Sequence, residues 1–173
     1  MTWRKVLLPV LTILFSATAL TGCFHYSFSG ASIPPNVHTI YIPFFPDKSN
    51  SGISNLSDEL NKALINRFVN QSRLHLASNK SNADIVIDGV IQSYSNQTFS
   101  IGGNQQVSSN RVQITVQATY QYSSDEKPLW TKTFSDFGDY DPNTDPIQGE
   151  KAAALDAIDK IARKMFNDSI GKW

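Results

Sequence analysis

Cys23 is the residue whose type and position in this sequence most clearly suggest a chemical reaction. It is the only cysteine among 173 residues, so its thiol is the only one the chain offers for modification. It ends an N-terminal segment with a basic start at Arg4 and Lys5, a mostly apolar stretch over 6–19 and small residues beside the cysteine. This order is typical of a secretory signal peptide. The apolar stretch is too short and interrupted for a membrane-spanning helix, which needs about 20 apolar residues.

Residues 20–23, Leu-Thr-Gly-Cys, resemble the lipobox of bacterial lipoprotein signals. The resemblance implies a thioether-linked lipid on Cys23, cleavage before Cys23 and acylation of the new N-terminus. The alternative is an ordinary signal peptide with an unrelated cysteine nearby. Several acyl chains anchor a protein durably, whereas one chain binds only marginally. Residue 24 is phenylalanine, not the aspartate that retains lipoproteins in the inner membrane, which favours the outer membrane.

The remaining sequence has no pattern typical of catalysis or metal binding. His25, His38 and His75 lie far apart, and none has a second histidine or cysteine at metal-ligand spacing. No Gly-x-Ser-x-Gly motif and no glycine-rich loop before a helix occurs. The aspartates between 136 and 145 lack the spacing and central glycine of a calcium-binding loop, so a solvated acidic turn is favoured. We therefore predict a protein that is not an enzyme and holds no cofactor or metal.

Charge and length narrow the remaining classes of protein. The chain has 15 basic and 15 acidic residues, so no basic excess suggests nucleic-acid binding. Without residues 1–22, 151 residues remain, enough for one domain with a real core. We predict a signal peptide over 1–22, a lipidated tether over 23–36 and a single domain over 37–173.

Hydrophobic periodicity gives the elements of that domain. Strands are predicted over 37–42, 84–94, 110–122 and 128–134, and 73–77 is a candidate for a further short strand. Helices are predicted over 55–70 and from a cap at Asp145 to Ile170, the latter with Ile147 and Leu155 on its apolar face. Segment 95–109 is predicted as a long hairpin loop, with pairing of its base as an alternative, and 135–146 as an acidic turn-rich segment. The fold class is therefore α+β, with two helices on one face of a mostly antiparallel sheet of about four strands.

The strand over 110–122 has the clearest alternation. Its even-numbered residues from Val112 to Tyr122 are mostly apolar and require a core, whereas the odd-numbered residues are polar and, apart from Arg111, uncharged. Gly89, inside the preceding strand, predicts a β-bulge or a close approach by another backbone.

Several short motifs, taken together and in order, resemble a divergent branch of the LptE family of lipoproteins. The residues that carry this resemblance are Cys23-x-x-Tyr26-x-Phe28, Gly30 to Pro35, Val37-x-Thr39-Ile40, Asn70 to Leu74, Gly89-x-Ile91-x-x-Tyr94, Asn110-Arg111-Val112-x-Ile114-x-Val116, Phe166-Asn167 and Trp173. The resemblance implies two helices against a four-stranded sheet, which agrees with the elements predicted above.

The same resemblance implies a function and partners. The protein is expected on the periplasmic side of the outer membrane, anchored through Cys23. There it would plug and help assemble an LptD-like β-barrel and assist lipopolysaccharide transport to the outer leaflet. Arg111 and Lys132, predicted on outward strand faces, are candidate lipopolysaccharide contacts. The alternative is a periplasmic lipoprotein that binds peptidoglycan or scaffolds another envelope complex.

Overall fold

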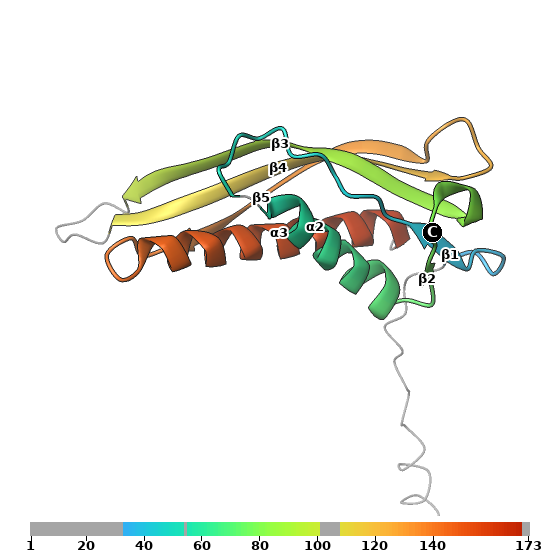
Figure 1. Cartoon of the computed structure of the whole chain (residues 1–173), viewed down its shortest axis with the longest axis horizontal. Coiled ribbons are helices and arrows are strands. Elements are labelled where there is room, and N and C mark those ends of the chain that lie inside the picture. Colours follow the sequence, from blue (N-terminus) through green and yellow to red (C-terminus); the bar gives the residue numbers. More distant parts are fainter. Residues whose placement is uncertain (1–32, 54, 101–107, 171–173) are drawn as a thin grey trace, which may run out of the picture. The chain divides into compact units, whose positions relative to one another are not determined.

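The computed structural model describes residues 33–53, 55–100 and 108–170 (Figure 1). The predicted signal peptide, Cys23 and Trp173 lie outside the described residues. The elements in chain order are β1 (Thr39–Tyr41), α2 (Leu56–Ile65), the π-helical turn η2 (Asn66–Asn70), β2 (His75–Leu76), the 3-10 turn η3 (Lys80–Asn82), β3 (Ile85–Ser100), β4 (Ser108–Tyr122), β5 (Trp130–Tyr140) and α3 (Pro146–Ile170).

The strands form one mixed sheet in the order β2-β1-β3-β4-β5. Strand β1 runs parallel to both β2 and β3, whereas β3, β4 and β5 are antiparallel. The α+β class is confirmed, but the prediction of about four strands in a mostly antiparallel sheet was wrong on both points. The helix α2 connects β1 to β2, and a crossover of this kind joins parallel strands. Strand β2 lies within the candidate short strand over 73–77 and has only two residues.

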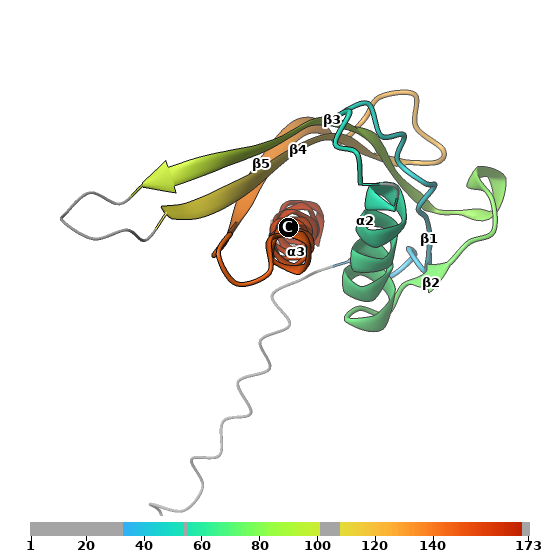
Figure 2. The same cartoon turned by 60° about the vertical axis from the view of Figure 1, so that its left-hand side comes forward.

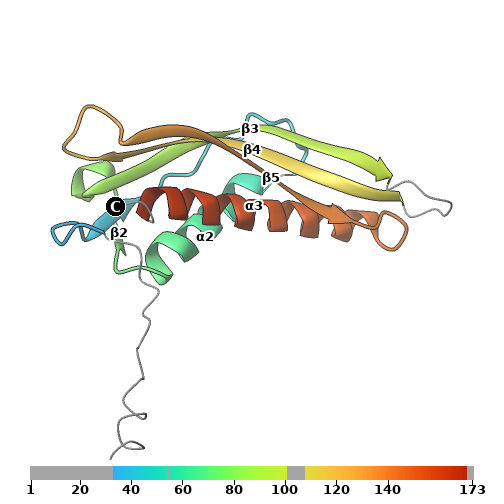
Figure 3. The ribbon, with the colours of Figure 1, turned by 180° about the vertical axis from the view of Figure 1, so that it is seen from behind.

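Both helices cover the same face of the sheet, as predicted (Figure 2). Seen from behind, α3 runs below the three antiparallel strands (Figure 3). Its aromatic Phe166 meets Phe68 of η2 edge-on, with ring centroids 5.3 Å apart. The core between helices and sheet includes the buried residues Leu56, Leu60, Leu64, Phe68, Ile87, Ile91, Ile114, Val116, Ile158, Ile161 and Met165.

Helix α3 begins as the sequence predicts. The Asp145 carboxylate accepts a hydrogen bond from the Gln148 N–H at 3.1 Å, so the predicted cap is confirmed. The predicted apolar face was too wide, because Ile147 is 77% exposed and Leu155 is also exposed.

Helix α3 packs closely on β5. A Cβ at Gly138 of β5 would lie 2.2 Å from the backbone oxygen of Ala153. The helix backbone therefore rests directly on β5 at a position that admits only glycine.

Strands β3, β4 and β5 are longer than predicted. Strand β3 continues to Ser100 and β4 starts at Ser108, so most of the predicted loop over 95–109 is a paired ladder. Strand β5 continues to Tyr140 through the segment predicted as a turn. The polar residues of these extensions bond one another across strands, and such pairing gives no apolar alternation for sequence analysis to detect.

Of the two irregularities suggested by Gly89, the close approach is present at the glycine itself, and a β-bulge lies further along the strand. A Cβ at Gly89 would lie 2.1 Å from the backbone oxygen of Gln117 and 2.7 Å from the Phe45 ring, so the predicted close approach is confirmed. The β3–β4 register then shifts between Ile91 and Ser93. Because of this bulge, Tyr94 stays on the side of the core, in register with buried Ile114.

Candidate functional site: the outer face and the free edge of the sheet

The outer face is the side of β3, β4 and β5 opposite the helices. The even-numbered residues of β4 from Val112 to Tyr120 are buried, so the odd-numbered residues face outward as predicted. Their side chains bond polar neighbours on adjacent strands. Gln113 donates to the Ser135 hydroxyl at 3.0 Å, and Gln117 accepts from the Gln92 amide at 3.2 Å. The result is a face of amides and hydroxyls with little charge.

Arg111 lies at one end of this face and is already paired. Its Nε and a terminal nitrogen donate to the two carboxylate oxygens of Asp139 at 2.7 and 2.8 Å. Its guanidinium carbon lies 3.7 Å from the ring centroid of Phe137 and 4.5 Å from that of Phe99. The hydrogen bonds from Arg111 hold the pKa of the Asp139 carboxyl below its usual value. An anion could bind Arg111 only by competing with this carboxylate.

Lys132 lies on the other side of the sheet. It is in register with buried Ala118, and its Nζ donates to the Asp168 carboxylate of α3 at 2.7 Å. The prediction of an outward position for Lys132 was therefore wrong, because Lys132 lies on the side of β5 that faces the core and its long side chain reaches α3. Lys132 borders a hollow of about 430 Å³ whose lining residues are Lys132, Thr133, Phe134, Lys164, Asn167 and Asp168.

The fold does not bring the two predicted contact residues together. Arg111 is in register with Asp139, whereas Lys132 is in register with Ala118, seven residues along β4 from Arg111. At about 3.4 Å per residue, these positions are roughly 24 Å apart along the strand. The two cations also lie on opposite faces, so they cannot contact one phosphate group together.

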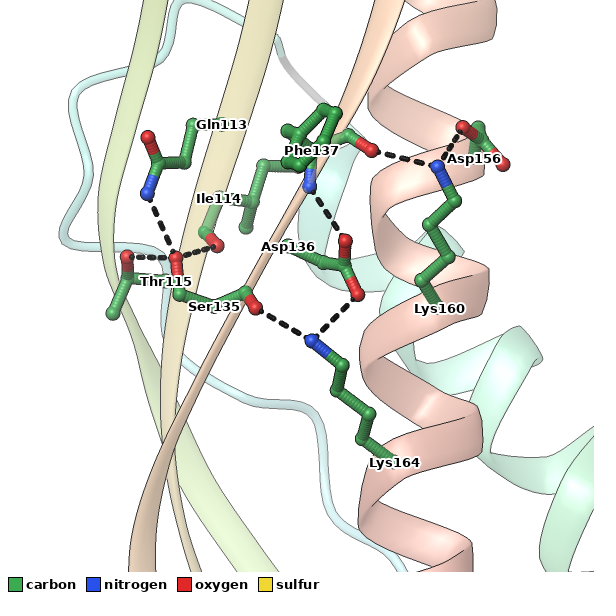
Figure 4. A network of polar contacts seen from close by, with 9 residues as sticks. All are labelled: Gln113, Ile114, Thr115, Ser135, Asp136, Phe137, Asp156, Lys160 and Lys164. Carbon is green, nitrogen blue, oxygen red and sulfur yellow. Dashed lines mark hydrogen bonds and ion pairs between the residues drawn. The ribbon is translucent and has the colours of Figure 1, made fainter.

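A polar network at the edge of β5 escaped sequence analysis (Figure 4). Lys164 of α3 donates to the backbone oxygen of Ser135 at 3.0 Å and pairs with the Asp136 carboxylate at 2.8 Å. Lys160 donates to the backbone oxygen of Phe137 at 2.8 Å and pairs with Asp156 at 2.6 Å. The one available signal was the spacing of Lys160 and Lys164, four residues apart on one helix face, a spacing that is also typical of a solvated surface.

The inner side of the long hairpin is polar where α3 begins. The Tyr94 hydroxyl donates to the Glu150 carboxylate. Burial raises the pKa of Tyr94, and the hydrogen bond to Glu150 raises it further. The Tyr140 hydroxyl accepts hydrogen bonds from the Asn96 and Asn110 amides at 2.8 and 3.1 Å. These contacts fix β3, β4 and β5 together beyond the apolar core.

The acidic segment is divided between strand and turn. Asp136 and Asp139 lie in β5 and bind cationic side chains, whereas Asp141 and Asp145 accept local hydrogen bonds before and at the start of α3. The predicted acidic turn is therefore correct only for its second half.

Within residues 33–53, 55–100 and 108–170, no group of three His, Cys, Asp or Glu side chains could hold a metal ion. No helix in those ranges has the length and apolar character to cross a bilayer.

Comparison with known proteins identifies a family. The family model LptE, described as lipopolysaccharide-assembly, matches residues 37–169. No match to the chain was found among curated protein sequences.

Several solved structures share the fold. A neuraminyllactose-binding hemagglutinin homologue from Helicobacter pylori is 14% identical, with a TM-score of 0.53 over 84% of this chain and 89% of that one. A protein from Xanthomonas campestris is 11% identical, with a TM-score of 0.53 over 79% and 87%. A minor lipoprotein from Acinetobacter baumannii is 15% identical, with a TM-score of 0.51 over 76% and 91%. At these identities the likeness concerns the fold alone.

Proposed function

Because this chain belongs to the LptE family of lipopolysaccharide-assembly proteins, which is not enzymatic, we propose that it is a plug and assembly subunit of an LptD-like outer-membrane barrel. In this proposal residues 1–22 are removed and Cys23 carries the lipid that holds the protein on the periplasmic side of the outer membrane. The match to the family model over residues 37–169 is the observation that carries the proposal.

The outer face is the surface that we propose lies against the barrel wall. The lumen of an outer-membrane barrel is polar, since inward and lipid-facing residues alternate along each strand. A surface of amides and hydroxyls such as Gln113, Gln117 and Thr119 can exchange hydrogen bonds with such a wall without burying unpaired charge. Thr119 and Thr131, whose hydroxyls lie 3.2 Å apart across β4 and β5, extend this surface.

Co-purification tests the proposed partner. The full-length chain is crosslinked mildly in cells, extracted in detergent and recovered by a tag. A large outer-membrane barrel is expected as the main product. Recovery of peptidoglycan fragments without a barrel would contradict the proposal and support the alternative of a peptidoglycan-binding lipoprotein.

We also propose that Arg111 and Lys132 contact lipopolysaccharide, each by exchanging its aspartate for a phosphate group. Arg111 offers two parallel donors, a geometry suited to phosphate as well as to the Asp139 carboxylate. Arg111→Ala and Lys132→Ala are expected to weaken binding of purified lipopolysaccharide to the full-length protein. Arg111→Lys keeps the charge but loses the paired donors, so it should bind with intermediate strength.

The matched control for this experiment is Arg163→Ala, which removes an exposed cation from α3 on the helix side. It should leave lipopolysaccharide binding unchanged. If Arg111→Ala and Lys132→Ala bound lipopolysaccharide as well as the wild type, neither residue would be a contact.

A further inference from the structure

Strand β5 forms one edge of the sheet over its 11 residues and is the longest edge stretch among the described strands. The opposite edge is formed by the two residues of β2 and, because β3 pairs with β1 only at Ile85 and Val86, by 92–100 of β3. An edge strand presents backbone N–H and C=O groups that can pair with another chain, and the risk of such pairing grows with the length of the edge. If strand addition occurs on this protein, β5 is therefore the edge at which we expect it.

Three backbone groups at the centre of β5 are already bound by side chains (Figure 4). The Lys164 ammonium donates to the Ser135 oxygen at 3.0 Å, and the Lys160 ammonium donates to the Phe137 oxygen at 2.8 Å. Between them, the Phe137 N–H donates to the Asp136 carboxylate at 3.0 Å. In an antiparallel pair of strands, every second residue points both its backbone N–H and its C=O away from the neighbouring strand. Ser135 and Phe137 are two residues apart, so their backbone groups point to the same side of β5, the side on which an added strand would pair.

The three side chains are held in place by charge and packing. Asp136 pairs with Lys164, and its side chain is only 13% exposed. Lys160 pairs with Asp156 one helical turn earlier and lies 5.4 Å from the Phe137 ring centroid. Burial raises the pKa of the Asp136 carboxyl, but the hydrogen bonds from Lys164 and the Phe137 N–H outweigh it and leave the pKa below its usual value. The carboxylate therefore stays ionised at neutral pH and retains Lys164.

We propose that Asp136, Lys160 and Lys164 form an edge seal that prevents β5 from pairing with the β5 strand of a second copy of this chain. A second copy is the expected competitor because two identical edges can pair about a two-fold axis, where each β5 supplies the groups that the other requires. The sealed residues lie in the middle of the strand, so an added strand could pair only with the short pieces on either side.

The seal is tested by removing the two ammonium groups while keeping most of each side chain. Full-length protein in detergent is compared with Lys160→Met plus Lys164→Met by size-exclusion chromatography with light scattering over a range of concentrations. The control carries Lys151→Met and Arg163→Met, which remove the same charge from exposed positions of α3. Within the described part of the chain, neither control side chain forms an ion pair or side-chain hydrogen bond.

The proposal expects the Lys160→Met, Lys164→Met protein to self-associate at least tenfold more tightly than the wild type and the control. Adding Thr133→Pro should restore the wild-type behaviour, because Thr133 shares the outward orientation of Ser135 and proline cannot donate to an added strand.

Two results would overturn the proposal. One is a folded variant, judged by circular dichroism, that self-associates no more tightly than the control. The other is self-association that persists unchanged after Thr133→Pro. If the double variant does not fold, Lys160→Met and Lys164→Met are measured singly, and each should self-associate more tightly than the matching single control.

Discussion

The two halves of the sheet are held together by different interactions. In the near half, which comprises β1, β2, 85–91 of β3, 116–122 of β4 and 130–134 of β5, apolar side chains pack against α2 and α3. In the far half, which comprises 93–100 of β3, 108–115 of β4 and 135–140 of β5, Val112 and Ile114 join the core, and hydrogen bonds and ion pairs link the strands around them, as at Tyr140 and Arg111. We therefore expect the near half to supply most of the stability, whereas the far half presents an ordered polar surface.

The largest expected effect is at Gly89 in the near half. Gly89→Val would drive a side chain into the Gln117 backbone and the Phe45 ring, so we expect a loss of about 3 kcal/mol or more in the free energy of unfolding. Urea denaturation followed by circular dichroism measures this loss. Gln97→Val, at an exposed position of the same strand in the far half, should change stability by less than about 0.5 kcal/mol. Equal losses at both positions would contradict the comparison.

The next largest effect concerns apolar side chains in the two halves. Leu64 is fully buried, and Leu64→Ala should cost about 2–5 kcal/mol by loss of contacts and formation of a cavity. Phe99 in the far half is 43% exposed, so Phe99→Ala should cost about 1 kcal/mol or less, although it removes a larger side chain. Thermal unfolding of both variants measures the difference. A larger loss of stability for Phe99→Ala than for Leu64→Ala would show that the main stabilising contacts lie in the far half, which contradicts the comparison.

Tyr140 tests the hydrogen bonds of the far half. Tyr140→Phe removes the hydroxyl that accepts from Asn96 and Asn110 and should cost about 1 kcal/mol. Hydrogen exchange should become faster in 95–98 and 110–113 while the near half stays protected. Uniformly faster exchange throughout the sheet would indicate that the two halves unfold as one unit.

The smallest effect is the pH dependence at Asp84, which joins β1 to the start of β3. Its carboxylate accepts from the His38 N–H, the Thr39 N–H and the Thr39 hydroxyl. These backbone hydrogen bonds, and the nearby His38 side chain, lower the pKa of Asp84. The contribution of the ionised carboxylate is therefore complete above the unfolded-state pKa of about 3.9 and is lost as the pH falls through the lower folded-state pKa.

Comparison with Asp84→Asn isolates this dependence. The difference in unfolding free energy between wild type and variant should shrink as the pH falls from about 5 to about 2. A difference that stays constant over this range would show that ionisation of Asp84 does not contribute.

Elements with one buried face could be predicted from the sequence. The stripe Leu56, Leu60, Leu64 and Phe68 predicted the first helix, and the Asp145 cap predicted the start of the second. The alternation of apolar and polar residues along β4 likewise predicted that Arg111 lies on the outer face of the sheet.

The far half and the edge of β5 could not be predicted in this way. There Asn96, Asn110 and Tyr140 extend the strands through side-chain hydrogen bonds, which leave no periodic apolar pattern. Lys132 was predicted on the wrong face because a long lysine side chain on the core side of a strand can still reach solvent and bind Asp168 of α3. The contacts of Lys160 and Lys164 join residues more than 20 positions apart, and neither composition nor spacing encodes them.

The most direct test of the central claim, that the outer face lies against an outer-membrane barrel, is photo-crosslinking in living cells. A photoreactive amino acid is placed at Gln117, exposed on the outer face, and separately at Arg163, exposed on the helix side. The proposal predicts that position 117 crosslinks to a large outer-membrane barrel in higher yield than position 163. Crosslinking to the barrel from position 163 with none from position 117, or no barrel adduct from either, would contradict it.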